Sequence, residues 1–74
     1  PKGIDLDILK QALLEISGVL DIHELHVWAI ASNKICLTSH VIIDEKSDCE
    51  SVLPMMRELL ASKFGIFHTT LQHE

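Results

Sequence analysis

The fold of this 74-residue chain is decided by the stretch Asp21-Ile22-His23-Glu24-Leu25-His26-Val27-Trp28-Ala29-Ile30. From residue 24 to residue 29, apolar side chains at odd positions alternate with Glu24, His26 and Trp28 at even positions. This period of two is typical of a β-strand with one buried face. The stretch also contains two histidines, side chains that commonly bind metal ions. We therefore predict a strand over residues 22–30 that carries candidate metal ligands.

A second strand is predicted over residues 35–43, after a turn at Ser32-Asn33. Its apolar face holds residues 35, 37, 41 and 43, and its other face carries His40. If the apolar faces of both strands coincide, the two sequence positions of each cross-strand pair must add up to an even number. A sum of about 66 places His26 opposite His40, so the hairpin is expected to bring two histidines together.

A helix is predicted on each side of this hairpin, followed by a last strand. Apolar residues at three- and four-residue spacing predict the first helix over residues 4–17, with Gly18 ending it in a left-handed conformation. A similar stripe predicts the second helix, which ends at Gly65. Residues 66–73 form the third predicted strand.

The start of the second helix has two alternative interpretations. Ser47 and Glu50 match a capping box, which leaves Pro54 deep in the helix, where it removes a hydrogen bond and kinks the chain. If Ser51 is the N-cap instead, Pro54 falls in the first turn and costs little. The sequence leaves both starts open.

The order helix-strand-strand-helix-strand predicts an α+β fold. Because a helix joins the second and third strands, these are expected to run parallel with a right-handed crossover. The result is one domain over residues 1–74, a ferredoxin-like two-layer sandwich with a three-stranded sheet and both helices on one face. The other face of the sheet stays bare and carries Trp28 and Ile42, an apolar area suited to a partner.

Composition excludes several classes of function. The net charge of −5 argues against nucleic acid as a partner, because phosphates require a basic surface. No apolar run approaches the roughly 20 residues that span a bilayer. Cys36 and Cys49 give no disulfide framework, which favours a reducing, cytosolic setting. The chain begins with Pro1 and has no initiator methionine, so we expect it to be part of a longer protein.

Catalysis is not expected. An amino-terminal proline can act as a general base where it opens a strand, but Pro1 leads through Lys2-Gly3 into a predicted helix. No serine or cysteine nucleophile is paired with a histidine in a recognised local pattern, and no glycine-rich phosphate loop is present. The sequence therefore predicts a binding domain rather than an enzyme.

The histidines are the strongest chemical signal in the sequence. All five lie on or beside predicted strands: His23, His26, His40, His68 and His73. Grouped on neighbouring strands, they are candidate ligands for zinc or another divalent transition metal. The competing interpretation is that His26 and His68 are ordinary half-buried polar residues of a sheet. Trp28 is likewise most simply a packing residue at an interface.

Three segments resemble the cation diffusion facilitator family. Gly18-Val19-Leu20-Asp21-Ile22-His23-Glu24-Leu25-His26-Val27-Trp28 is similar to its "GV…VHDLHVW" signature. Further similarity follows at Ser39-His40-Val41 and at Lys63-Phe64-Gly65-Ile66 with His68-Thr69-Thr70-Leu71-Gln72. The resemblance covers nearly all of the chain. It implies the cytosolic carboxy-terminal domain of a membrane-embedded zinc (or other divalent cation)/proton antiporter, with the same fold and a homodimeric assembly.

The resemblance also implies a ligand set. The family's first histidine ligand matches His23, its second-strand ligand matches His40, and its terminal-strand ligand matches His73. A further family histidine is replaced by Leu71, for which His68 is expected to compensate. The weaker candidates are Glu74, His26 and Cys49.

The positions of His23 and His40 conflict with strict alternation, which puts their side chains on opposite faces. The two can meet if His23 lies at the entry of its strand, where the chain still turns, or if they act across a dimer, and we expect the first.

Three functions follow from these expectations. The leading one is a regulatory domain on the cytosolic face of a membrane that binds metal and dimerises to bias transport by the transmembrane domain of the same chain. The first alternative is a soluble ferredoxin-like regulatory or metallochaperone module. The second is a purely structural dimerisation domain that binds no metal, for which loss of His23 and His40 leaves the dimer unchanged.

Overall fold

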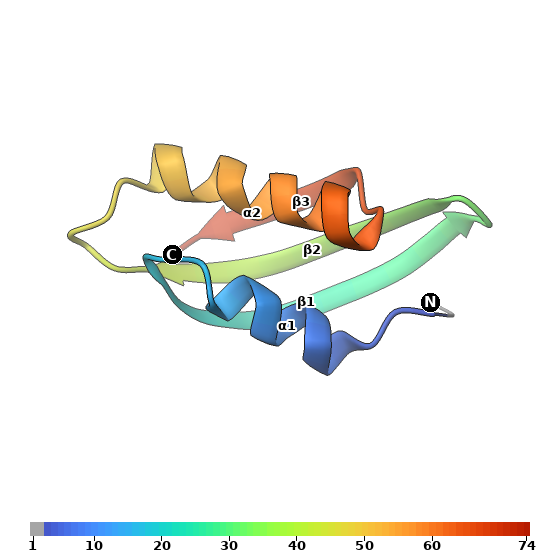
Figure 1. The fold of residues 1–74 in the computed structure, drawn as a ribbon, viewed down its shortest axis with the longest axis horizontal. Helices are drawn as coiled ribbons and strands as arrows, with labels where there is room; N and C mark the ends of the chain where they lie inside the picture. Colours follow the sequence, from blue (N-terminus) through green and yellow to red (C-terminus); the bar gives the residue numbers. More distant parts are fainter. Residues whose placement is uncertain (1–2) are drawn as a thin grey trace.

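The computed structural model describes residues 3–74, and Pro1 and Lys2 lie outside the described residues. The elements are α1 (Leu6–Leu14), β1 (Val19–Ala31), β2 (Lys34–Ile43), α2 (Cys49–Phe64) and β3 (His68–His73) (Figure 1). The predicted order of helices and strands is confirmed. Within residues 3–74, no helix has the length and apolar character needed to cross a membrane.

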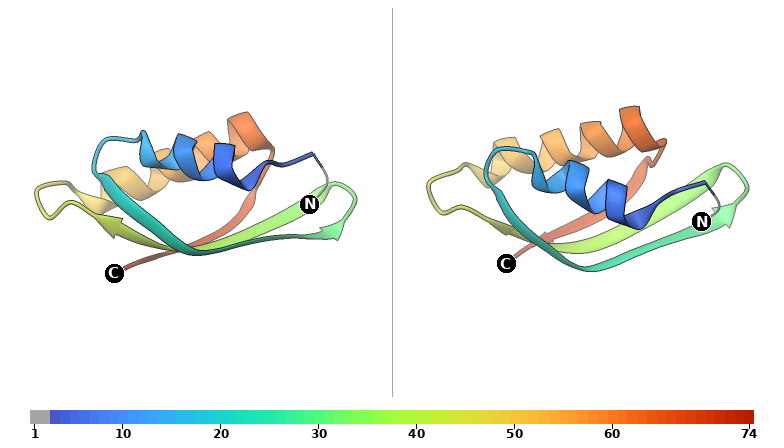
Figure 2. Two further views of the ribbon diagram at one scale, coloured as in Figure 1. Left: turned by 90° about the horizontal axis from the view of Figure 1, so that it is seen from below. Right: turned by 60° about the horizontal axis from the view of Figure 1, so that its bottom comes forward.

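The three strands form one sheet with β2 in the centre. β1 pairs with β2 in antiparallel fashion, and β3 pairs with β2 in parallel fashion, as the connecting helix predicted. Both helices cover the same face of the sheet (Figure 2). This is a ferredoxin-like sandwich without the usual first strand, and the predicted fold class is confirmed. We call the face of the sheet without helices the open face.

The hydrophobic core lies between the helices and the sheet. Its fully buried large side chains are Leu9, Leu13, Ile22, Leu37, Val41, Met56, Leu60 and Ile66. Burial of each such side chain is worth roughly 1.5–3 kcal/mol. On the open face Trp28 remains 44% exposed, and the predicted position of this side chain on the face without helices is confirmed.

α1 is shorter than its hydrophobic stripe predicts. Asp5 is the N-cap, and its carboxylate accepts hydrogen bonds from the N–H groups of Asp7 and Ile8. The helix ends at Leu14 with Glu15 as C-cap, so the predicted extension to residue 17 and the capping role of Gly18 are wrong. Gly18 has a positive φ of +97° in the turn into β1, where the chain passes close to the segment before α2.

α2 begins at neither of the two starts that the sequence suggests. Its N-cap is Asp48, whose Oδ1 accepts a hydrogen bond from the Glu50 N–H at 3.0 Å and whose Oδ2 accepts one from the Ser51 hydroxyl at 3.1 Å. Pro54 therefore lies inside the helix, past the first turn. Gly65 ends the helix in the left-handed conformation with a φ of +69°, as predicted.

The cap assignment can be tested by substitution. Asp48→Ala is expected to lower the free energy of unfolding by about 1 kcal/mol, because the Glu50 N–H and the Ser51 hydroxyl both lose their acceptor. Ser47→Ala, at the sequence-predicted cap, is the matched control and is expected to change it by less than about 0.5 kcal/mol. Urea unfolding of both variants measures the difference. A larger loss in Ser47→Ala would contradict the assignment.

The hairpin register differs from the predicted one. Around the turn at residues 32 and 33, Ala31 pairs with Lys34, and after an irregularity His26 pairs with Thr38. The pairing sum is then 26 + 38 = 64 rather than 66, so the predicted pairing of His26 with His40 is wrong.

A β-bulge at Glu24 changes the register once more. Beyond it His23 pairs with His40, so Glu24 and Leu25 together face one residue, Ser39. The extra residue places both His23 and His26 on the open face, which strict alternation forbids. The expected explanation, that His23 lies at the strand entry, is wrong because His23 lies well inside β1.

The bulge requires an unusual backbone at Glu24. Its φ of +51° makes it the one non-glycine residue with positive φ in residues 3–74. For a residue with a Cβ, this conformation costs roughly 1–2 kcal/mol. Such strain persists only where the surrounding structure enforces it, and it concentrates at functional sites.

Candidate metal centre

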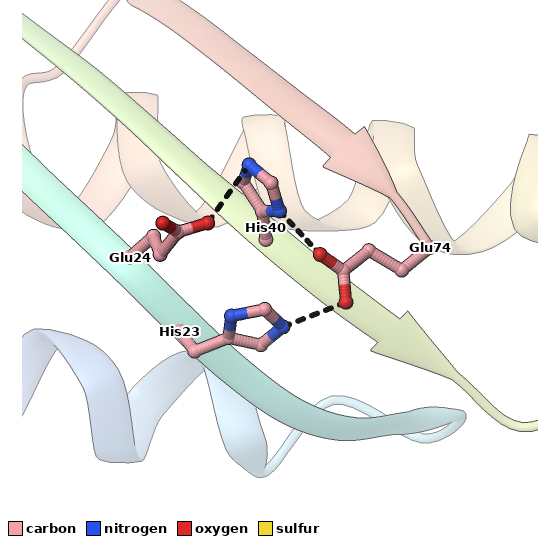
Figure 3. A group of neighbouring side chains, drawn as sticks. All are labelled: His23, Glu24, His40 and Glu74. Atoms are coloured by element: carbon pink, nitrogen blue, oxygen red, sulfur yellow. Dashed lines mark hydrogen bonds and ion pairs between the residues drawn. The ribbon is translucent and has the colours of Figure 1, made fainter.

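Four side chains from β1, β2 and the residue after β3 converge on the open face near the carboxyl end of the chain. They are His23 and Glu24 of β1, His40 of β2 and Glu74, which directly follows β3 (Figure 3). We call this group the candidate metal centre. Each residue offers one nitrogen or oxygen ligand atom, and these atoms lie within 4.8 Å of one another.

Glu74 lies between the two histidines. His23 Nε2 donates a hydrogen bond to Glu74 Oε1 at 2.8 Å, and His40 Nδ1 donates one to Glu74 Oε2. The two imidazole rings are tilted by 52°, with centroids 5.3 Å apart. On its other side, His40 Nε2 lies 3.2 Å from Glu24 Oε2. The two histidines and two carboxylates thus form one continuous chain of contacts (Figure 3).

The backbone holds these side chains in place. His23 and His40 are directly opposite each other across β1 and β2. The Glu74 N–H donates to the Val41 carbonyl at 3.0 Å, which continues the ladder of β3 by one residue. Ser39 is buried, and its hydroxyl lies within donating distance of the carbonyls of His23 at 3.0 Å and His40 at 3.1 Å. Ser39 thereby supplies a polar partner where the bulge interrupts the strand pairing.

The contacts shift the ionisation of His40 and Glu74 in opposite directions. The hydrogen bond to Glu74 raises the pKa of His40, helped by the negative charges of Glu24 and Glu74 and opposed by partial desolvation. The hydrogen bond from His40 lowers the pKa of Glu74, helped by His23 and again opposed by desolvation. Both side chains are partly exposed, so water screens the pair and its contribution to stability is small.

The donor set fits a divalent transition metal. Imidazole nitrogen and carboxylate oxygen are preferred ligands of zinc, which is usually bound in tetrahedral geometry. Donor atoms around a tetrahedral zinc lie about 3.3 Å apart, so the observed spread of 4.8 Å closes with small side-chain rotations. The side chains are between 31% and 61% exposed and have room to make them.

Three of the residues predicted as ligands meet in this centre: His23, His40 and the weaker candidate Glu74. Glu24, a possible zinc ligand by its side-chain chemistry, completes the group and is not in the ligand set that the family resemblance implies. The position of Glu24 in this centre depends on the bulge, and the local sequence gives no signal for a bulge. The assignment of each residue as a ligand stays a prediction.

The other predicted ligands lie outside the group. His26 is opposite Thr38, two residues along β2 from His40. His68 is opposite Cys36, about 13 Å from His40 along the strand. His73 is opposite Val41, which is a core residue. The pleat therefore directs the side chain of His73 away from the open face, and the next residue, Glu74, lies on that face instead. Cys49 begins α2, in the helical layer.

Comparison with known proteins places the chain in a family. A family model described as cation efflux protein, cytoplasmic domain, matches residues 1–74. The metal cation efflux system protein CzcD of Cupriavidus metallidurans is 41% identical over 75 residues, which cover 100% of this chain and 24% of that protein. The proton-coupled zinc antiporter SLC30A2 of Mus musculus is 36% identical over 74 residues, which cover 100% of this chain and 20% of that protein.

A solved structure agrees with this placement. The metal-bound C-terminal domain of the CzcD transporter from Cupriavidus metallidurans has a TM-score of 0.90 and 42% identity, covering 96% of this chain and 99% of that chain. The present chain spans between a fifth and a quarter of the length of the two curated relatives. Because the match extends over its whole length in sequence and nearly its whole length in structure, the chain belongs to the cation efflux family, as a cytoplasmic domain.

Proposed function

We propose that this chain is the cytosolic regulatory domain of a divalent cation/proton antiporter, and that it binds a transition metal, with zinc favoured, at the candidate metal centre. The observation that carries the proposal is the convergence of two histidines and two glutamates, from β1, β2 and the residue after β3, on the open face. The names of two relatives, a proton-coupled zinc antiporter and a metal-bound CzcD domain, support it. In this role the chain has no catalytic function of its own.

The residues that would hold the ion are His23, His40 and Glu74, whose donor atoms already face one another. A bound ion supplies a crosslink between β1, β2 and the end of β3. Because the unfolded chain has no such preformed site, the free energy of metal binding adds to the free energy of unfolding.

A second copy of the chain is the partner that the proposal requires. Trp28 is 44% exposed and Ile30 is 67% exposed, both on the long strand β1, and Phe67 just before β3 is 73% exposed. Such apolar surface is stabilised by burial against a partner. A metal that binds more tightly to one arrangement of the two copies shifts their equilibrium and thereby biases transport by the membrane-embedded part of the full protein.

The test is a zinc titration of this chain by calorimetry, with sedimentation of the same samples. We expect saturable binding, and a lower dissociation constant of the dimer in the presence of zinc. A chelator should reverse both effects. A chain that does not bind zinc would contradict the proposal.

One observation favours the structural alternative. In the absence of a metal, the contacts of Glu74 with His23 and His40, together with that of Glu24 with His40, already give each of the four side chains a polar partner. A domain that only dimerises could use this chain of contacts to stabilise its sheet. Such a domain would show a dimer with the same dissociation constant with and without zinc.

A further inference from the structure

The imidazole of His40 has a carboxylate at each of its two nitrogens. Nδ1 contacts Glu74 Oε2, and Nε2 lies 3.2 Å from Glu24 Oε2 (Figure 3). The two nitrogens of one ring point in diverging directions, so a single metal ion binds one of them. The other nitrogen then keeps its hydrogen and donates it to a nearby acceptor, commonly a carboxylate.

The two sides of the ring are unequal. On the Nδ1 side, Glu74 is in contact with both His40 and His23, so an ion there gathers two imidazoles and one carboxylate. On the Nε2 side, Glu24 is the side chain of the centre in direct contact with the ring. Three protein ligands with one open position are a common arrangement for zinc, whereas two are a poor one.

We infer that Glu24 is a positioning residue: it accepts the Nε2–H of His40 and thereby commits His40 to bind the metal through Nδ1. The inference rests on the proposed function and assigns different roles to the two carboxylates of the same site. Glu74 is the ligand, and Glu24 fixes the tautomer and orientation of the ring.

The bulge explains how Glu24 can take this role. Glu24 follows His23 directly, and in a regular strand adjacent side chains point to opposite faces. The positive φ at Glu24 breaks this alternation, so that both residues reach the same centre. The side chain of Glu24 is 61% exposed, against 31% for His40, as expected for a group at the rim that contacts a ligand from outside.

Substitutions of Glu24 separate a positioning role from a ligand role. Glu24→Ala removes the acceptor, and loss of such an outer partner is expected to weaken zinc binding about 10- to 100-fold. In Glu24→Gln the amide oxygen can still accept the Nε2–H, so this variant is expected to retain more affinity than Glu24→Ala. Glu45→Ala is the matched control, because it removes the same charge from an exposed turn. We expect its zinc affinity to equal that of the wild type.

Nitrogen NMR of the histidine rings gives a readout that stability alone does not change. In the zinc-loaded wild type, we expect the metal at Nδ1 of His40 and the hydrogen at Nε2. In Glu24→Ala, Glu74 remains as the carboxylate acceptor at Nδ1, so we expect the hydrogen of the metal-free ring at Nδ1 instead of Nε2. Melting curves in the presence of a chelator test whether each variant remains folded.

The possible failures can be told apart. Zinc bound at Nε2 of His40, or Glu24→Gln as weak as Glu24→Ala, would make Glu24 a ligand and overturn the inference while leaving the proposed function intact. Wild-type affinity in Glu24→Ala would also overturn the inference alone. A wild-type chain that binds no zinc in the calorimeter would overturn the proposed function, and the inference with it.

Discussion

His40→Ala is expected to weaken zinc binding by more than about 100-fold, because the loss of an outer partner alone costs about 10- to 100-fold. His40 lies on the central strand and contacts both carboxylates of the candidate metal centre. Without it, His23 and Glu74 remain as two ligands of one ion. Competition with a chelating dye measures the affinity of the variant, and sedimentation shows whether zinc still strengthens the dimer.

The matched control for this variant is His26→Ala. His26 is on the same open face and the same hairpin, but it lies opposite Thr38 and outside the metal centre. We expect its zinc affinity to be unchanged. Circular dichroism in the presence of a chelator checks that both variants are folded, since His40 is partly exposed and its removal creates no core cavity. Tight zinc binding by His40→Ala would place the metal elsewhere.

Gly18→Ala is expected to destabilise the fold by about 2–5 kcal/mol. A Cβ at this position would lie 2.7 Å from Ser47 Oγ, 3.0 Å from Ser47 Cβ and 3.1 Å from Val52 Cγ2. Its positive φ of +97° adds a cost of about 1–2 kcal/mol, and overpacking adds roughly 1–3 kcal/mol. A single core of this size supplies only about 3–5 kcal/mol, so a loss in the upper part of this range leaves much of the variant unfolded at room temperature.

Gly65→Ala separates the two contributions. Gly65 also has a positive φ, +69°, but a Cβ there meets no atom within 4 Å. We expect the free energy of unfolding of Gly65→Ala to fall by about 1–2 kcal/mol, which is the cost of the positive φ alone. Thermal unfolding of both variants in a chelator gives the comparison. Equal losses would mean that the segment around Ser47 moves aside at little cost.

The sequence predicts the layers of this fold because its local patterns agree with one another. Alternation from Glu24 to Ala29 identifies the first strand, and the two-residue turn at 32 and 33 identifies the hairpin. The helix between β2 and β3 requires a crossover, from which the parallel pairing follows. Gly65 ends α2 where its backbone freedom predicts. These features depend on neighbours in the sequence.

The details of the candidate metal centre depend on contacts that are distant in the sequence. Glutamate has no preference for positive φ, so the bulge at Glu24 follows from its surroundings, among them the hydroxyl of Ser39 on the opposite strand. The choice of Glu74 over His73 follows from the parallel register, in which His40 is opposite Gln72. A shift of one residue in the pairing of β3 with β2 would place His73 on the open face and Glu74 on the other. The alternation of side chains along the sequence does not determine this register.

The bulge at Glu24 also affects how this chain behaves among its copies. β1 is a 13-residue strand with β2 on one side only, so its outer backbone groups form a long edge on which another chain could add a strand. At Glu24 the regular spacing of these groups is broken, and the carboxylate adds a charge near the middle of the edge. A foreign strand therefore finds the edge interrupted near its middle, so we expect the irregularity that assembles the candidate metal centre also to hinder pairing of this edge with another chain.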